Sequence, residues 1–219
     1  MQMQKVKTGL SLATIVASMA VLLFHFFQLP PKIDPRPHIG IGNVLAEQAA
    51  KALGTGGRII LVAPDTATFR WPGPEVQLKA LFSALRKRNL AVAVTNVIKL
   101  DPGRLVRVNA DDFMNLLRKQ SEADVVVSLL GPPLPNADQK ARLPAKRPRV
   151  IAVCAGDMPK QINLSALFDD NLLHVAIVSR PAPAVGLPET DDPQTWFDHF
   201  YQVAASRTAV ESLSLAPAP

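Results

Sequence analysis

Arg58-Ile59-Ile60-Leu61-Val62-Ala63-Pro64-Asp65 is a short aliphatic run that ends abruptly at Pro and Asp, and it predicts the first central strand of the fold. Three later segments repeat this design, at residues 124–131, 149–157 and 172–181. Each is apolar for several residues and then breaks at Gly, Pro, Ser or Asp. A strand buried on both faces has this pattern because neither side-chain direction meets water. These four runs therefore predict the central strands of a parallel sheet.

Helical patterns lie between these runs, and a further strand is predicted over residues 90–98. The predicted helices cover residues 43–53, 74–88, 111–119, 136–143, 162–168 and 193–205. Strands that alternate with helices in this way imply right-handed βαβ units. The predicted fold class is α/β, with a single doubly wound, mainly parallel five-stranded sheet of the Rossmann-like or flavodoxin-like kind.

The amino-terminal segment 8–29 predicts a membrane anchor, because its twenty-two residues include no Lys, Arg, Asp or Glu. A helix of that length crosses a hydrocarbon core of about 30 Å. The run ends in aromatic residues and Pro30 without a small-residue cleavage site, which favours an uncleaved anchor. Lys5 and Lys7 place the amino terminus in the cytoplasm by the positive-inside rule. We expect a single-pass inner-membrane protein with its soluble domain in the periplasm.

The sequence divides the chain into four predicted segments. Residues 1–29 are predicted to form a cytoplasmic tip and transmembrane anchor, and residues 30–42 a Pro-rich linker. Residues 43–206 are the predicted α/β domain, and residues 207–219, which end in Ala-Pro-Ala-Pro, are a predicted disordered tail.

The start of the apolar segment supports an alternative. Gly9-Leu10-Ser11-Leu12 resembles the cleavage site of type IV prepilins. That family carries Glu at the fifth mature position, where this chain has Thr14. The resemblance implies a pilin-like subunit.

Charge and composition exclude several classes of protein. The net charge is +6, but the basic runs at 86–88 and 140–149 are short, and no aromatic residues are interleaved to stack on bases. We therefore expect no nucleic-acid partner. The single cysteine, Cys154, excludes a disulfide scaffold and a CxxC site. The glycine-rich run 54–57 precedes a strand, whereas a phosphate-binding loop must follow one. No spacing fits a metal site, and no cofactor is expected.

Polar and small residues follow the predicted strands at their carboxyl ends, the edge where ligands bind in such sheets. The candidate ligand-binding residues are Asp65, Thr66, Ser128, Gly131, Gly156, Asp157, Ser179 and Arg180. They predict a polar pocket for a small molecule. The same residue types also end strands and form turns in any protein.

Cys154 is the one candidate catalytic residue. The segment Ile151-Ala152-Val153-Cys154-Ala155-Gly156 is similar to the nucleophile elbow of the DJ-1/PfpI group. The resemblance implies a Cys-dependent hydrolase or amidotransferase-like enzyme, with the thiolate favoured by a helix amino terminus. No His follows the Cys, and the alternative is a small buried thiol.

The order of elements resembles one lobe of a type I periplasmic binding protein. The likeness rests on residues 59–63, 74–88, 124–128 and 149–153. It implies an extracytoplasmic module, although such proteins hold their ligand between two lobes and this chain has room for one. We therefore expect a membrane-anchored, extracytoplasmic α/β binding or assembly module of a bacterial envelope. It is expected to be non-catalytic and to bind an envelope protein.

Overall fold

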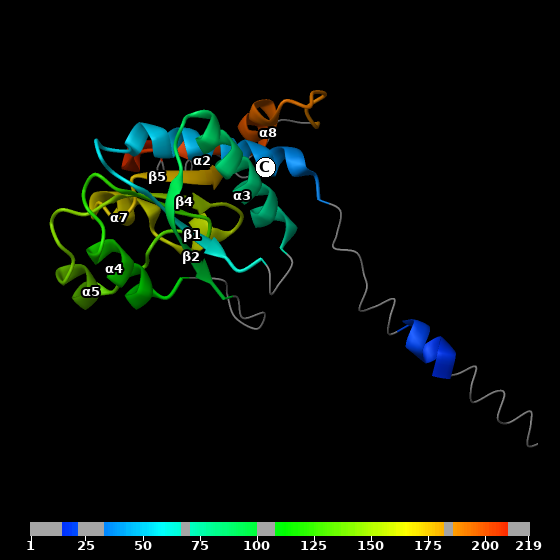
Figure 1. Cartoon of the computed structure of the whole chain (residues 1–219), viewed down its shortest axis with the longest axis horizontal. Coiled ribbons are helices and arrows are strands. Elements are labelled where there is room, and N and C mark those ends of the chain that lie inside the picture. Colours follow the sequence, from blue (N-terminus) through cyan, green and yellow to red (C-terminus); the bar gives the residue numbers. More distant parts are fainter. Residues whose placement is uncertain (1–14, 22–32, 67–70, 100–107, 182–185, 210–219) are drawn as a thin grey trace, which may run out of the picture. The chain divides into compact units, whose positions relative to one another are not determined.

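The computed structural model describes residues 15–21, 33–66, 71–99, 108–181 and 186–209. The chain divides into two compact units, Met1–Ile33 and Asp34–Pro219. The second unit contains the α/β domain (Figure 1).

In the first unit, residues 15–21 are helical. Nowhere in the part of the chain that the structure describes is a helix both long and apolar enough to cross a membrane. The other residues of the predicted anchor at 8–29, and the predicted cytoplasmic tip before it, lie outside the described residues.

The second unit alternates helices and strands along the chain. In chain order these are α2 (Pro35–Ala52), β1 (Ile59–Pro64), α3 (Pro72–Lys87), β2 (Val92–Ile98), α4 (Ala110–Arg118), β3 (Val125–Ser128), α5 (Ala137–Ala141), β4 (Arg149–Cys154), α6 (Met158–Gln161), α7 (Leu164–Asp169), β5 (Val175–Ser179), α8 (Pro193–Phe200) and β6 (Tyr201–Ala204). The strands form one sheet in the order β2-β1-β3-β4-β5-β6.

The predicted α/β class and mainly parallel sheet are confirmed, since β1 to β5 pair in parallel with their neighbours. The predicted number of five strands is wrong. A sixth strand, β6, pairs antiparallel with β5 and occupies residues predicted to continue the last helix. Helix α8 ends at Phe200 because Tyr201 already has an extended backbone, with φ −132° and ψ 167°.

The core lies on both faces of the sheet, which explains the unbroken aliphatic runs. On one face, Leu61, Val127 and Ile151 pack with apolar residues of α2, α3 and α8. On the other face, Ile60 and Val126 pack with apolar residues of α4 and α7 (Figure 1). The strands therefore have helices on either side, as a doubly wound sheet requires.

Helix α2 begins within the segment predicted to be a Pro-rich linker. Residues 35–42 are helical, because Pro35 and Pro37 fall in the first turn, where a missing N–H costs nothing. The Asp34 side chain caps the helix by accepting a hydrogen bond from the Arg36 backbone N–H at 2.9 Å. The expected helix start at residue 43 is therefore wrong by two turns.

Helix α2 packs unusually closely on its neighbours at two glycines. A Cβ on Gly42 would lie 2.5 Å from the Gln77 carbonyl oxygen of α3 and 2.6 Å from the Ala80 Cβ. A Cβ on Gly40 would lie 2.4 Å from the Pro193 carbonyl oxygen of α8. These two glycines allow α2 to contact both helices through its backbone.

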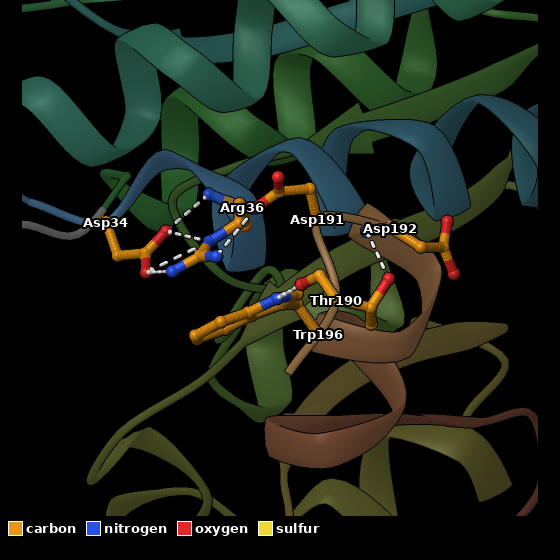
Figure 2. A network of polar contacts seen from close by, with 6 residues as sticks. All are labelled: Asp34, Arg36, Thr190, Asp191, Asp192 and Trp196. Atoms are coloured by element: carbon orange, nitrogen blue, oxygen red, sulfur yellow. Dashed lines mark hydrogen bonds and ion pairs between the residues drawn. The ribbon is translucent and has the colours of Figure 1, made fainter. Parts of the chain in front are cut away.

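The start of α2 is also fastened to α8 by a polar cluster (Figure 2). The Arg36 guanidinium lies 3.9 Å from the centre of the Trp196 ring and forms ion pairs with Asp34 at 2.7 Å and Asp191 at 2.8 Å. The Trp196 Nε1 donates to the Thr190 carbonyl oxygen at 2.6 Å. Because Trp196 is only 2% exposed, its burial rather than the surface ion pairs carries most of the stabilisation.

The buried carboxylate of Asp124 joins two loops at the edge of the sheet where the strands β1 and β3 begin. Asp124 is 1% exposed and accepts hydrogen bonds from the backbone N–H groups of Arg58 at 2.7 Å and Ser121 at 2.8 Å. Burial by itself would raise the pKa of Asp124, but these hydrogen bonds outweigh it and lower the pKa to about 2.

Asp124→Asn is expected to remove part of the acid sensitivity of the fold. The pKa of Asp124 falls from 3.8 to about 2 on folding. Its ionised form therefore stabilises the fold above about pH 4, and that contribution is lost as the pH falls towards 2. The gap in unfolding midpoint between wild type and variant should close over this range, measured by thermal unfolding. Asp138→Asn, on the exposed helix α5, is the control. A gap that stays constant with pH would contradict the assignment.

The predicted disordered tail at 207–219 begins with described residues that are helical, 207–209. Arg207 forms an ion pair with Asp169 at 3.0 Å, which fastens this turn to α7. The remaining residues of the predicted tail lie outside the described residues.

Candidate functional site

The candidate residues after β1 lie where they were expected, at the carboxyl edge of the sheet. Asp65 and Thr66 are half-buried, and the Asp65 backbone N–H donates to the Ile98 carbonyl oxygen at 2.8 Å. This bond links the ends of β1 and β2. The next residues, 67–70, lie outside the described residues.

The candidate residues after β3 form a buried turn. The Ser128 hydroxyl donates to the Gly131 carbonyl oxygen at 2.6 Å and accepts from the Leu130 N–H at 3.3 Å. Ser128 is fully buried, and Gly131 has φ +88°, which favours glycine. The Ser128 hydroxyl thus holds its own turn and is not presented to a ligand.

Two of the four candidate residues at the ends of β4 and β5 are in contact. The Gly156 N–H donates to the Ser179 hydroxyl oxygen at 2.9 Å, which joins the two loops. Arg180 turns towards β6 instead, where its Nε donates to the Tyr201 carbonyl oxygen at 3.1 Å. Asp157 is exposed at the start of α6. The structure therefore brings Gly156 and Ser179 together, through a bond that holds the loops to each other.

Cys154 has the environment of a core residue. Its side chain is fully buried in the apolar layer that also contains Val126 and Ala176. Burial raises the pKa of the Cys154 thiol to about 12. A nucleophilic cysteine has a lowered pKa and an accessible sulfur. The environment of Cys154 thus fits the alternative of a small buried thiol. A nucleophile elbow at residues 151–156 would need an accessible thiolate, which Cys154 does not provide.

Cys154 is expected to be inert to iodoacetamide at neutral pH in the folded chain and to react fully once the chain is unfolded. The physical reason is that neither the thiolate nor a path to it exists in the fold. Mass spectrometry of the labelled chain, with and without denaturant, measures the difference. The variant Ser83→Cys, with a thiol on the exposed side of α3, is the positive control. Labelling of native Cys154 at a rate near that of the control would restore the enzyme alternative.

A cavity lies between the edge strand β2 and helix α4, and its lining includes Ile98, the residue whose carbonyl oxygen accepts from the Asp65 N–H. Its volume is about 630 Å³. Its lining residues are Val62, Val94, Thr95, Asn96, Val97, Ile98, Val108, Asp112, Phe113, Asn115, Leu116, Lys119 and Gln120. We name this cavity the β2–α4 groove. It combines an apolar strip with side-chain amides, one acid and one base.

Strand β2 is exposed on both of its faces. Val94 is 42% exposed and Val97 is 55% exposed, and their side chains point to opposite faces of the sheet. The seven residues Val92–Ile98 include no charged residue and no Pro. Within the described residues, β2 pairs on one side only, with β1. The sequence predicted this strand, but only the strand order shows that it forms an edge.

The part of the chain that the structure describes contains no group of three or more His, Cys, Asp or Glu residues placed to hold a metal ion.

Comparisons with known proteins concern the fold. No family model and no curated protein matches the chain. Among solved structures, it is similar to a periplasmic ribose ABC transporter protein from Conexibacter woesei, at 14% identity over 83% of this chain and 53% of that one, with a TM-score of 0.44. It is also similar to a sugar-binding protein of a sugar ABC transporter from Bacillus halodurans, at 10% identity over 80% and 64%, with a TM-score of 0.48.

A third match is the substrate-binding protein of a sugar ABC transport system from Bordetella parapertussis, at 14% identity over 80% and 57%, with a TM-score of 0.48. The chain spans about half to two thirds of the length of these three structures. These matches agree with the predicted fold-level resemblance to periplasmic binding proteins, and at these identities and TM-scores the resemblance is one of fold alone.

Proposed function

We propose that the chain is a membrane-anchored, extracytoplasmic α/β module of a bacterial envelope that binds a protein partner and catalyses no reaction. The observation that carries the proposal is the exposed, uncharged edge strand β2. The first 29 residues supply the anchor, with the amino terminus in the cytoplasm and the α/β domain in the periplasm.

An edge strand exposes a row of backbone N–H and C=O groups that can pair with another strand. Natural sheets protect such edges with Lys, Pro, short strands or a covering segment. The opposite edge follows this rule, because β6 has four residues and its last, Ala204, is buried. Strand β2 has an irregular register at Ala93, but from Val94 to Ile98 it is regular, carries neither Lys nor Pro and exposes Val94 and Val97. These features suit a strand that pairs with a partner.

The anchor rests on the uncharged segment 8–29 and on the two lysines before it. The absence of a catalytic reaction rests on Cys154, the one candidate nucleophile, which is buried with a raised pKa. A binding role needs no nucleophile, and an exposed edge is sufficient for it.

The proposal is tested by placing the photoreactive residue p-benzoylphenylalanine at position 97 of the full chain and irradiating intact cells. We expect a cross-linked protein product. The same residue at position 187, where Leu187 is 68% exposed, is the control for non-specific reaction. Equal cross-linking at both positions, or none at 97, would overturn the proposal that β2 is the binding surface.

A small-molecule ligand in the β2–α4 groove is a second candidate function. The groove volume falls within the range of about 300–1,000 Å³ that is typical of ligand pockets. Asn96, Asn115 and Gln120 provide both donors and acceptors, which suits a neutral, hydroxyl-rich molecule. Calorimetric titration of the full chain with mono- and disaccharides tests this function. Binding that Asn115→Leu removes and Ser83→Ala leaves intact would support it, and no heat at millimolar sugar would exclude that ligand class.

A further inference from the structure

We infer that the partner at β2 is a second copy of this chain, paired antiparallel to the first across a two-fold axis at Asn96. The inference rests on the proposed function, because both place the binding surface on β2. It adds the identity of the partner and the register of the pairing.

The regular part of β2 is centred on Asn96. The pairing with β1 shifts between Val92 and Val94, so the strand is regular only from Val94 to Ile98. An antiparallel pairing of this segment with itself sets Asn96 opposite Asn96 of the other copy. It then sets Val94 opposite Ile98, and Thr95 opposite Val97. These are β-branched pairs, which stabilise neighbouring strands, and the side-chain amide of Asn96 can both donate and accept.

The two-fold axis also places each face of β2 beside the same face of β2 in the other copy. Val94, Asn96 and Ile98 are in register with Ile60, Val62 and Pro64, so they share the face covered by α4. Thr95 and Val97 lie on the other face. A two-fold axis perpendicular to the sheet keeps each face on its own side. The exposed Val94 therefore meets an apolar residue of the other copy and not the solvent.

The charges that line the groove are complementary to themselves. Asp112 of α4 and Lys119, the C-cap residue of α4, both line it and are seven residues apart, or about 10 Å along the helix axis. Under the two-fold axis, the α4 helices of the two copies run in opposite directions. Asp112 of each copy is then on the same side as Lys119 of the other, and like charges are kept apart. This complementarity selects a second copy over an unrelated strand, which would have no reason to match both ends.

The first test measures the mass of the full chain in detergent by sedimentation equilibrium, with the detergent density-matched. We expect twice the single-chain mass for the wild type and the single-chain mass for Val97→Lys, because a lysine on each copy protects the edge. Leu187→Lys is the matched control, since it places the same charge at another exposed apolar position, and it should keep the dimer. A monomeric wild type, or a Val97→Lys variant that remains dimeric, would overturn the inference.

The second test uses position 96, because the proposed axis places this residue opposite the same residue of the other copy. Residues opposite each other in an antiparallel pair have Cα atoms about 4.5–5.5 Å apart, within the range for a disulfide. Asn96→Cys should form a disulfide-linked dimer under mild oxidation, whereas Ser83→Cys and the wild type, whose Cys154 is buried, should not. Equal dimer from Asn96→Cys and Ser83→Cys would contradict the register.

The cross-link from position 97 separates the two proposals. A product between two copies of the chain supports both. A product with a different protein overturns the second copy and leaves the proposed function standing. No product overturns both.

Discussion

Trp196→Ala is expected to lower the free energy of unfolding of the α/β domain by about 4 kcal/mol, as is typical when a large buried aromatic side chain is truncated. Trp196 is 2% exposed and is the largest of the fully buried side chains in the part of the chain described. Its loss also removes the ring on which Arg36 lies, which is one of the contacts between the start of α2 and α8 (Figure 2).

Thermal unfolding of the full chain, followed by circular dichroism, measures this effect. Trp196→Phe is the matched variant, because it keeps a buried aromatic ring while it loses the Nε1 donor to the Thr190 carbonyl and part of the ring volume. That variant should lose about 1–2 kcal/mol, which includes one hydrogen bond. If Trp196→Ala unfolded at the same temperature as Trp196→Phe, the packing role assigned to the ring would be incorrect.

Gly42→Ala is expected to cost about 3 kcal/mol, because the added methyl group meets the backbone of α3 and not a flexible side chain. The Gln77 carbonyl oxygen would lie 2.5 Å from the new Cβ, and neither helix can shift without disturbing the core around Ile41 and Leu81. This is the position where the contact of α2 with α3 is most sensitive to size.

Gly56→Ala is the control for Gly42→Ala. Gly56 has φ +72° but no atom within 4 Å of an added Cβ. Its substitution should cost only the backbone strain, about 1–2 kcal/mol. Equal unfolding midpoints for the two variants would show that α2 and α3 are not in close contact at Gly42.

The sequence predicts the parallel sheet well, because burial on both faces leaves an unbroken aliphatic run in β1, β3, β4 and β5. The sequence predicts helix and strand boundaries incorrectly where the local residue pattern favours one structure and contacts with distant residues favour another. Trp196, Phe197 and Phe200 are spaced for a helix, and the pattern continues into Tyr201 without a break. The helix nevertheless ends at Phe200, because residues Tyr201–Ala204 pair with β5 and form β6. At α2, the prolines suggest a linker, whereas Pro35 and Pro37 fit a first turn capped by Asp34.

The sequence predicts less of the candidate site than of the fold. Ser128, Gly131 and Gly156 are candidates because such residues follow strands, and each does lie at the carboxyl edge. Their hydrogen bonds, however, hold turns and loops together. The groove beside β2 could not be predicted, because Val94 and Val97 resemble core residues until the strand order places them at an edge. Exposure of that strand is a property of the topology and not of its residues.

We propose that an amino-terminal anchor holds this α/β module outside the cytoplasm, and one labelling measurement tests this directly. Ser83→Cys provides a single accessible thiol for testing it, because the native Cys154 is buried. A membrane-impermeant maleimide applied to intact bacterial spheroplasts should label this variant, and the labelled chain should sediment with membranes after carbonate extraction. Labelling only after the spheroplasts are lysed, or recovery of the chain in the soluble fraction, would contradict the account.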